Sequence, residues 1–159
     1  MTSPSALRRF EYEAQLLARL RHPCIAQIYE AGTHDEGGTT VPFFAMEYVR
    51  GVPITTYCDA NRLDTHQRLD LFRQICDGVQ HAHQKGVIHR DIKPSNILVA
   101  IEDGQPVPKI IDFGVARATD SDLAVTTLQT DVGQLVGTMQ YMSPEQIEAD
   151  PHDIDTRSD

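Results

Sequence analysis

Paired cysteines, an excess of basic residues and long apolar runs are all missing from this 159-residue chain. Its three cysteines lie far apart and form no Cys-x-x-Cys pair, which indicates buried thiols in a reducing cytoplasm rather than a disulfide framework. Acidic residues outnumber basic ones by 23 to 14, and the formal charge of -9 argues against nucleic acid or an anionic membrane as the main partner. No apolar stretch approaches the roughly 20 residues that cross a bilayer, and we expect no signal peptide before Leu7.

The residues that are present predict one globular domain with a helix in its middle. The composition, 40% hydrophobic and 23% charged, is that of a chain that buries a core. A helix is predicted from Asp64 or Thr65, either of which can serve as N-cap, to about Lys85, and Gly86 is positioned to end it. Its apolar face is predicted to consist of Leu69, Phe72, Ile75, Cys76 and Val79.

Short apolar runs predict strands on both sides of that helix. They are expected to form two hairpins, 25–29 with 43–49 across a polar stretch at 34–40, and 97–100 with 109–111 across a turn at 102–106. The first 21 residues contain another helical pattern, over 5–21, that His22-Pro23 is expected to end. The predicted class is therefore α+β.

Residues 89–96, His-Arg-Asp-Ile-Lys-Pro-Ser-Asn, are a polar stretch between two apolar runs and are predicted to be a loop. The stretch contains the carboxylate of Asp91, the ammonium of Lys93 and the amide of Asn96, and Asp112 follows the next strand-like run. Phosphoryl transfer needs a carboxylate to take a hydroxyl proton, a cation beside the moving group and oxygen ligands for magnesium. The loop is therefore the candidate active site.

The order of these motifs resembles a known family. His89-Arg90-Asp91 with Asn96, then Asp112-Phe113-Gly114 and Ser143-Pro144-Glu145, is similar to the signature of the eukaryotic-like protein kinases, and the likeness covers almost the whole chain. Lys93, together with Gly137-Thr138, favours the serine/threonine branch, as in bacterial kinases of the Hanks type.

The resemblance implies a protein-kinase-like two-lobed fold that is truncated at both ends. Residues 1–50 would form part of the small lobe without its first strands, and 51–159 would form part of the large lobe without the helices that follow the activation segment. It also implies ATP and Mg²⁺ as cofactors and a protein as substrate. In this reading Asp91 accepts the hydroxyl proton, Lys93 neutralises charge on the transferred group, and Asn96 and Asp112 bind the metal.

The small-lobe residues take their roles from the same resemblance. The helix over 5–21 would carry Glu13, the glutamate that pairs with a lysine of the third kinase strand. The backbone of Glu47 and Val49 would bind adenine, and Met46 would set the depth of the pocket. The alternatives are a solvated helix charge for Glu13 and a plain edge strand for the other three.

A long threonine-bearing stretch from Val115 to Met142 corresponds to an activation loop. Arg90, next to the catalytic aspartate, marks kinases whose activation loop is organised by a phosphate, which a guanidinium grips in a bidentate way. Thr126, Thr127 and Thr130 are the candidate acceptors, modified within one molecule or in trans by a second copy. A solvated flexible loop is the alternative.

Two kinase features are absent from the sequence. No Gly-x-Gly-x-x-Gly precedes Glu13, and the only lysines are Lys85, Lys93 and Lys109, so the third-strand lysine is missing. If one electrostatic contact contributes roughly 100-fold to 1,000-fold in rate, the isolated chain is expected to be nearly inactive. We expect a piece of a longer kinase, cytoplasmic here, with a membrane anchor elsewhere in the parent protein left open.

Two other functions remain open at this point. A pseudokinase that binds partners without chemistry is favoured by the missing pieces and disfavoured by Asp91, Asn96 and Asp112. A small-molecule phosphotransferase of the aminoglycoside or choline type would share the fold and the magnesium aspartate. Against it stand the long threonine-bearing loop and the Ser143-Pro144-Glu145 motif, which serve protein substrates.

Overall fold

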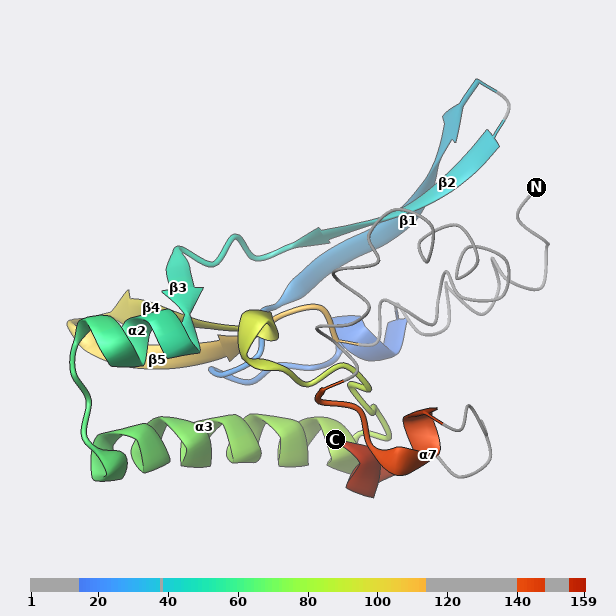
Figure 1. Cartoon of the computed structure of the whole chain (residues 1–159). Helices are drawn as coiled ribbons and strands as arrows, with labels where there is room; N and C mark the ends of the chain where they lie inside the picture. Colours follow the sequence, from blue (N-terminus) through green and yellow to red (C-terminus); the bar gives the residue numbers. More distant parts are fainter. Residues whose placement is uncertain (1–14, 38, 114–139, 148–154) are drawn as a thin grey trace.

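A computed structural model describes residues 15–37, 39–113, 140–147 and 155–159. In chain order its elements are β1 (Ile28–Glu36), β2 (Thr39–Met46), β3 (Gly51–Pro53), α2 (Ile54–Ala60), α3 (Thr65–Gln84), η1 (Pro94–Asn96), β4 (Ile97–Glu102), β5 (Gln105–Ile110), α7 (Pro144–Ile147) and η2 (Thr156–Ser158). Figure 1 shows α3 running along one side of the β3–β4–β5 sheet while the β1–β2 hairpin extends away from it. Within the described ranges no helix is long and apolar enough to cross a membrane.

The first predicted hairpin is confirmed, but both strands lie closer to the turn than predicted: β1 begins at Ile28 rather than residue 25, and β2 ends at Met46 rather than residue 49. β1 and β2 are antiparallel, and their pairing continues through the polar residues to Glu36 and Thr39. Gly37 has φ +64°, a left-handed conformation that glycine adopts without a Cβ clash. Because the pairing reaches Glu36 and Thr39, most of the predicted polar stretch belongs to the two strands rather than to a loop.

The second predicted hairpin is confirmed as well. β4 and β5 pair up to Glu102 and Gln105, and Asp103 and Gly104 between them have φ of +47° and +76°. Two consecutive left-handed residues make the tight turn whose twist suits a two-residue hairpin. β3 adds a third strand, where a Cβ on Gly51 would lie 2.7 Å from the Val99 carbonyl oxygen, so only glycine fits.

Helix α3 has the predicted ends, but its predicted buried face is confirmed only at Ile75, which is buried, and at Val79, which packs against the core. Asp64 is the N-cap of a capping box with Gln67, and Gly86 follows the C-cap with φ +76°. The buried residues are Leu71, Ile75, Gly78 and Ala82, whereas the predicted Leu69 and Phe72 are 58% and 59% exposed and Cys76 is exposed. The helix carries two apolar stripes, and the one with the small residues turns inward.

The first helix is shorter than predicted at its end. Residues 15–18 are helical, whereas the sequence had placed the end of this helix at residue 21.

Small residues on α3 allow the chain after the first helix to pack closely. A Cβ added to Gly78 would lie 3.3 Å from the side chains of both Cys24 and Ile110. The backbone of Cys24 and Ala26 hydrogen-bonds to Ile110, at 2.8 and 2.9 Å. The resulting core contains Leu17, Leu20, Ile25, Ile28, Ile75, Ala82, Val87, Ile97, Ile110 and Phe113.

Candidate active site

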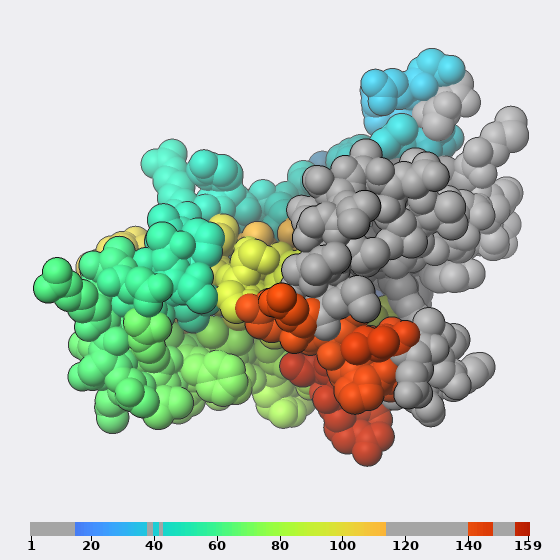
Figure 2. All heavy atoms as spheres, in the orientation of Figure 1, coloured from blue at the N-terminus to red at the C-terminus, as the bar shows by residue number. Residues whose placement is uncertain are grey.

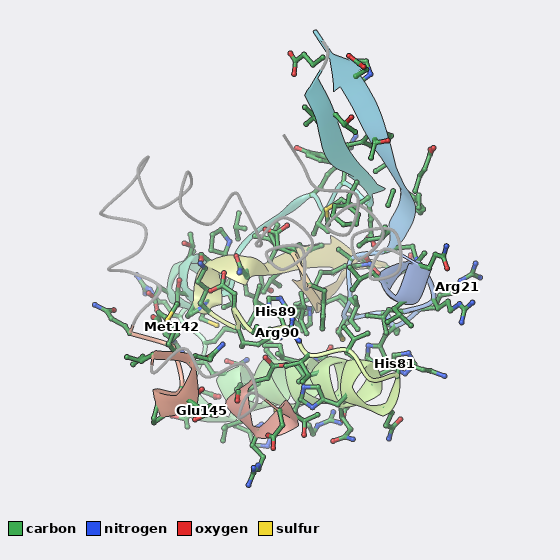
Figure 3. All side chains as sticks on the ribbon, turned by 90° about the vertical axis from the view of Figure 1, so that its right-hand side faces the viewer. Arg21, His81, His89, Arg90, Met142 and Glu145 are labelled. Atoms are coloured by element: carbon green, nitrogen blue, oxygen red, sulfur yellow. The ribbon has the colours of Figure 1, made fainter. Side chains whose placement is uncertain are left out.

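Residues 89–96 form a loop between two buried anchors, as predicted. Val87 before it and Ile97 after it are 8% and 6% exposed, and η1 leads directly into β4. Figure 3 shows His89 and Arg90 between the sheet and α3. The Asp91 side chain remains 32% exposed, so the loop is fixed at both ends while its carboxylate stays accessible.

Three predicted catalytic residues meet in this loop. The Lys93 ammonium lies 2.8 Å from Asp91 Oδ2, and Asn96 Nδ2 donates to the same oxygen at 3.0 Å and to the Asp91 carbonyl at 2.9 Å. Both Asp91 atoms can only accept, so the nitrogen of the Asn96 amide must face them. This leaves the Asn96 side-chain oxygen as the atom of that amide able to bind a cation.

Asp112 reaches the same region through the backbone. Ile111 N–H donates to the Asn96 carbonyl at 2.9 Å, which continues the β4–β5 pairing by one step and places Asp112 next along the chain. Asp112 has φ +61°, a conformation that costs a non-glycine residue about 1–2 kcal/mol. Buried Phe113 packs edge-on against His89 with ring centroids 4.5 Å apart. Neighbours on both sides of Asp112 are therefore held against the loop.

The donor set suits magnesium. The described residues contain no cluster of three or more His, Cys, Asp or Glu side chains that could hold a metal. One carboxylate, Asp112, and one amide oxygen, Asn96, are instead available on adjacent segments. Mg²⁺ is commonly bound by one or two protein oxygens, with phosphate oxygens and water completing its octahedral shell. The side-chain oxygens of Asn96 and Asp112 are of the kind that magnesium takes as ligands.

His89 organises the loop as a neutral imidazole. It is 1% exposed; Asp91 N–H donates to its Nδ1 at 3.2 Å, and its Nε2 lies 2.9 Å from the Ile111 carbonyl oxygen. Because a carbonyl only accepts, Nε2 carries the proton and Nδ1 carries none. Burial lowers the pKa of His89, although the Ile111 carbonyl and nearby carboxylates oppose the shift. Its contacts with the Phe113 ring and with backbone atoms give His89 a structural role.

The lowered pKa of His89 predicts that acid destabilises the fold. The half-buried His22 also has a lowered pKa, through burial and then the charge of His81. Below pH 6.5, the ordinary pKa of histidine, these side chains bind protons in the unfolded chain but remain neutral in the folded chain. The stability that the fold has at pH 7.5 is therefore lost as the pH falls toward the pKa values of the folded state. Each group contributes at most about 1.4 kcal/mol per pH unit.

Urea unfolding of the chain at pH 7.5, 6.5 and 5.5 checks this expectation. The unfolding midpoint should fall at each step. Replacing exposed His66 by glutamine should leave the pH dependence of the unfolding midpoint unchanged, whereas His22→Gln should reduce that dependence. A midpoint that is constant or rises on acidification would contradict the neutral, buried state of His89.

The predicted hinge follows β2. Glu47 N–H donates to the Gln27 carbonyl at 2.7 Å, and the Val49 carbonyl accepts from Gly51 N–H at 3.0 Å. Among the backbone hydrogen bonds of the described residues, none uses the Glu47 carbonyl or the Val49 N–H. These are one acceptor and one donor two residues apart, which suits the edge of an adenine ring. Met46 is half-buried and packs against the core at the end of β2.

A buried lysine ties this hinge to the second hairpin, which the sequence analysis missed. Lys109 Nζ lies 2.7 Å from Glu47 Oε1 and 3.0 Å from Glu102 Oε1, and Gln27 N–H donates to the other Glu47 oxygen at 3.1 Å. Burial opposes the charge on both partners, but their hydrogen bonds lower the pKa of Glu47 and raise the pKa of Lys109. A lysine inside an otherwise apolar strand was the available signal, since such a residue needs a carboxylate.

Lys109→Met is expected to destabilise the chain by about 1–3 kcal/mol, the range for a lost hydrogen bond to a charged group. The substitution keeps the volume but leaves Glu47 and Glu102 facing each other without their cation. The free energy of urea unfolding measures the loss, and Lys85→Met at an exposed position is the matched control. Equal stability of the two variants would show that the ion pairs contribute nothing.

The Asp159 carboxylate binds the backbone at the start of the catalytic loop. Its side chain is fully buried; Oδ2 accepts from His89 N–H at 2.7 Å, Oδ1 accepts from Arg90 N–H at 2.6 Å, and His83 Nε2 donates to Oδ2 at 2.8 Å. The contact with His83 joins α3 to the same carboxylate. Glu145, from the Ser143-Pro144-Glu145 motif, accepts a hydrogen bond from the Ser158 hydroxyl.

Several predicted residues cannot be placed. Glu13, Gly114 and the pair Gly137-Thr138 lie outside the described residues. The three candidate phosphoacceptors, Thr126, Thr127 and Thr130, lie outside them too. These assignments stay predictions.

Comparison with known proteins decides the family. The family model for the protein kinase domain matches residues 2–159. The chain belongs to the protein kinase family. Its mixed helix and sheet content is that of a kinase fold cut short, because the chain spans about half of the solved kinase domains it resembles. The predicted family and fold class are thereby confirmed.

The chain is similar to bacterial serine/threonine kinases. It is 36% identical over 157 residues to the serine/threonine-protein kinase PknB of Mycobacterium leprae and 37% identical over 158 residues to PknB of Mycobacterium tuberculosis, covering 98% of this chain and 24% of each relative. The crystal structure of the Mycobacterium tuberculosis PknI kinase domain aligns with a TM-score of 0.64 and 27% identity, over 98% of this chain and 53% of that one.

Proposed function

We propose that this chain is the central part of a serine/threonine protein kinase that transfers the γ-phosphate of ATP to Ser or Thr hydroxyls of proteins. Residues 1–50 would belong to its small lobe and 51–159 to its large lobe. The observation that carries the proposal is the meeting of Asp91, Lys93 and Asn96, with hydrogen-bond distances of 2.8–3.0 Å at one carboxylate oxygen. A set of unrelated capping residues would have no reason to converge on that oxygen.

Asp91 is the proposed base. An accessible carboxylate can accept a hydrogen bond from the substrate hydroxyl, orient its lone pair toward phosphorus and take its proton as the new bond forms. Lys93, already 2.8 Å from Asp91 Oδ2, would stabilise negative charge on the transferred phosphoryl group. Asn96 holds Asp91 in place with its amide nitrogen, which fixes the direction of attack.

The nucleotide would bind between the hinge and the two metal ligands. The Glu47 carbonyl and Val49 N–H would bond adenine beside Met46. Asn96 and Asp112 would hold Mg²⁺, which when bound neutralises phosphate charge and orients the γ-phosphate. Two observations support this placement: no backbone hydrogen bond among the described residues uses the two hinge groups, and the Asn96 amide nitrogen faces Asp91, which leaves its oxygen for a cation.

Phosphorylation of Thr126, Thr127 or Thr130 by a second copy of the kinase is proposed as the activating step. Arg90 is half-buried at the catalytic loop, and a guanidinium there can bind a phosphate that approaches from the following segment. Replacing all three threonines by alanine in the complete kinase should then abolish activation by preincubation with ATP. Unchanged activity would contradict the role of these residues.

A phosphotransfer assay with labelled ATP tests the function. The kinase domain completed with its missing strands and helices should phosphorylate a Ser/Thr peptide panel and leave an aminoglycoside unmodified, whereas the 159-residue chain alone should show almost no turnover. Transfer to the aminoglycoside would indicate a small-molecule phosphotransferase. Magnesium-dependent ATP binding in a thermal shift without any transfer would indicate a pseudokinase.

A further inference from the structure

Side chains from distant segments hold the peptide groups that lead into Asp91. Asp159 accepts from the N–H groups of His89 and Arg90, at 2.7 and 2.6 Å. From the other side, Gln146 Nε2 donates to the Arg90 carbonyl at 2.6 Å. Arg90 has φ +70°, so its backbone departs from the usual conformation of a non-glycine residue. Such a conformation persists where its surroundings fix it, and here both polar atoms of the Arg90 backbone are bound.

Gln146 uses both ends of its amide. Besides its bond to Arg90, its Oε1 accepts from Ser143 N–H at 2.9 Å, and its own N–H donates to the Ser143 carbonyl at 3.1 Å. Because Ser143 N–H only donates and the Arg90 carbonyl only accepts, the orientation of the amide is determined by its partners. Figure 2 shows the segment 140–147, in orange, beside yellow atoms of the part of the chain that follows residue 90. Gln146 thus connects α7 to the catalytic loop.

The peptide that Gln146 binds is the one that joins Arg90 to Asp91. Its carbonyl oxygen is held by Gln146, and its N–H, which belongs to Asp91, is held by His89 Nδ1 at 3.2 Å. With both ends bound, the plane of this peptide is fixed, and with it the direction in which the Asp91 side chain leaves the backbone. Lys93 and Asn96 then bind a carboxylate whose side chain leaves the backbone in a fixed direction.

We propose that Gln146 is a positioning residue for the Asp91 base. It fixes the orientation of the Arg90–Asp91 peptide. The alignment of Asp91 therefore depends on whether residues 143–147 pack against the catalytic loop. This inference rests on the proposed kinase function, since only a reacting Asp91 has a geometry to preserve. Gln146 itself is not expected to touch substrate or nucleotide.

Two variants separate positioning from local structure. Gln146→Ala removes both bonds. Gln146→Glu keeps an oxygen for Ser143 N–H but replaces the donor to Arg90 with a second oxygen, which faces the Arg90 carbonyl. If Gln146 only stabilises α7, the glutamate variant should behave as wild type. If it positions Asp91, both variants should be impaired. Gln80→Ala, which removes an exposed glutamine from α3, is the matched control.

The first measurement uses the 159-residue chain and needs no activity. Hydrogen exchange of peptides covering 88–92 should be at least several-fold faster in both Gln146 variants, while amides of α3 keep their wild-type exchange. Wild-type exchange over 88–92 in Gln146→Glu would overturn the proposal. If Gln146→Ala lost protection throughout the chain, it would be unfolded and would not test the proposal. The glutamate variant, which retains the bond to Ser143, would then decide it.

The second measurement uses the completed kinase domain. Both variants should lower kcat by about tenfold to a hundredfold, the scale of a misplaced catalytic group, with KM for ATP unchanged. Wild-type kcat in either variant, or a change confined to KM, would refute a positioning role. A wild-type domain that transfers no phosphate to any protein would instead remove the proposed function, and the exchange result would still show whether Gln146 fixes the loop.

Discussion

Asp91→Asn is expected to lower kcat of the completed kinase domain by about 10²-fold to 10⁴-fold, the usual contribution of a general base. Asparagine has nearly the same shape but cannot take up the hydroxyl proton, and it removes the charge that Lys93 faces at 2.8 Å. Nucleotide binding should survive, because the hinge, Asn96 and Asp112 are unchanged. The loss should therefore fall on kcat, with KM for ATP altered little.

Steady-state assays with varied ATP check this expectation, together with a thermal shift for magnesium-dependent ATP binding. Asp70→Asn, at an exposed position on α3, is the control that changes the same functional group without touching the loop. If Asp91→Asn retains turnover within a few-fold of wild type, Asp91 is not the base. If it loses ATP binding as well, the substitution has disturbed the loop rather than the proton transfer.

Asp159→Ala is expected to destabilise the 159-residue chain by about 3–5 kcal/mol, because each buried donor left without an acceptor costs about 1–3 kcal/mol. Its carboxylate is fully buried and receives three hydrogen bonds, from His89 N–H, Arg90 N–H and His83 Nε2. Alanine would leave all three donors buried without an acceptor. The free energy left over would be a small fraction of what a domain of this size has.

Urea denaturation measures that loss. Asp159→Asn should be intermediate, because its amide keeps one acceptor oxygen for the two backbone donors. Asp70→Ala, where the carboxylate is exposed, should stay within about 0.5 kcal/mol of wild type. A stable Asp159→Ala chain would mean that water or another group replaces the carboxylate, and the loop would then need no support from this end.

Local signals predicted most of the elements. The ends of α3 followed from Asp64 and Gly86, because caps depend on residues only a few positions apart. The second hairpin turn was predicted at 102–106, and the structure narrows it to Asp103-Gly104. The buried face of α3 could not be predicted in the same way. Leu69 and Phe72 are as apolar as Leu71 and Ile75, and the choice depends on the small residue Gly78, which lets the helix approach Cys24 and Ile110.

In the candidate site, too, the residues close together in the sequence were predicted and the contacts between distant segments were not. Asp91, Lys93 and Asn96 lie within six positions, so the sequence alone could place them in one loop. Lys109, Gln146 and Asp159 act on partners far away in the chain, and their side-chain types are common on any surface. Their contacts depend on how the hairpins, α3 and α7 come together. Long-range polar contacts were therefore the part that required the structure.

The burial of Lys109 has a practical consequence for labelling. The chain has three lysines, of which Lys109 and Lys93 have side chains only 9% and 19% exposed and are ion-paired, whereas Lys85 is exposed. An amine-reactive fluorophore used at low stoichiometry should attach at Lys85 in preference to the other two side chains. The dye would then sit directly after α3, four positions before His89, where its emission would report the surroundings of the segment that leads into the catalytic loop.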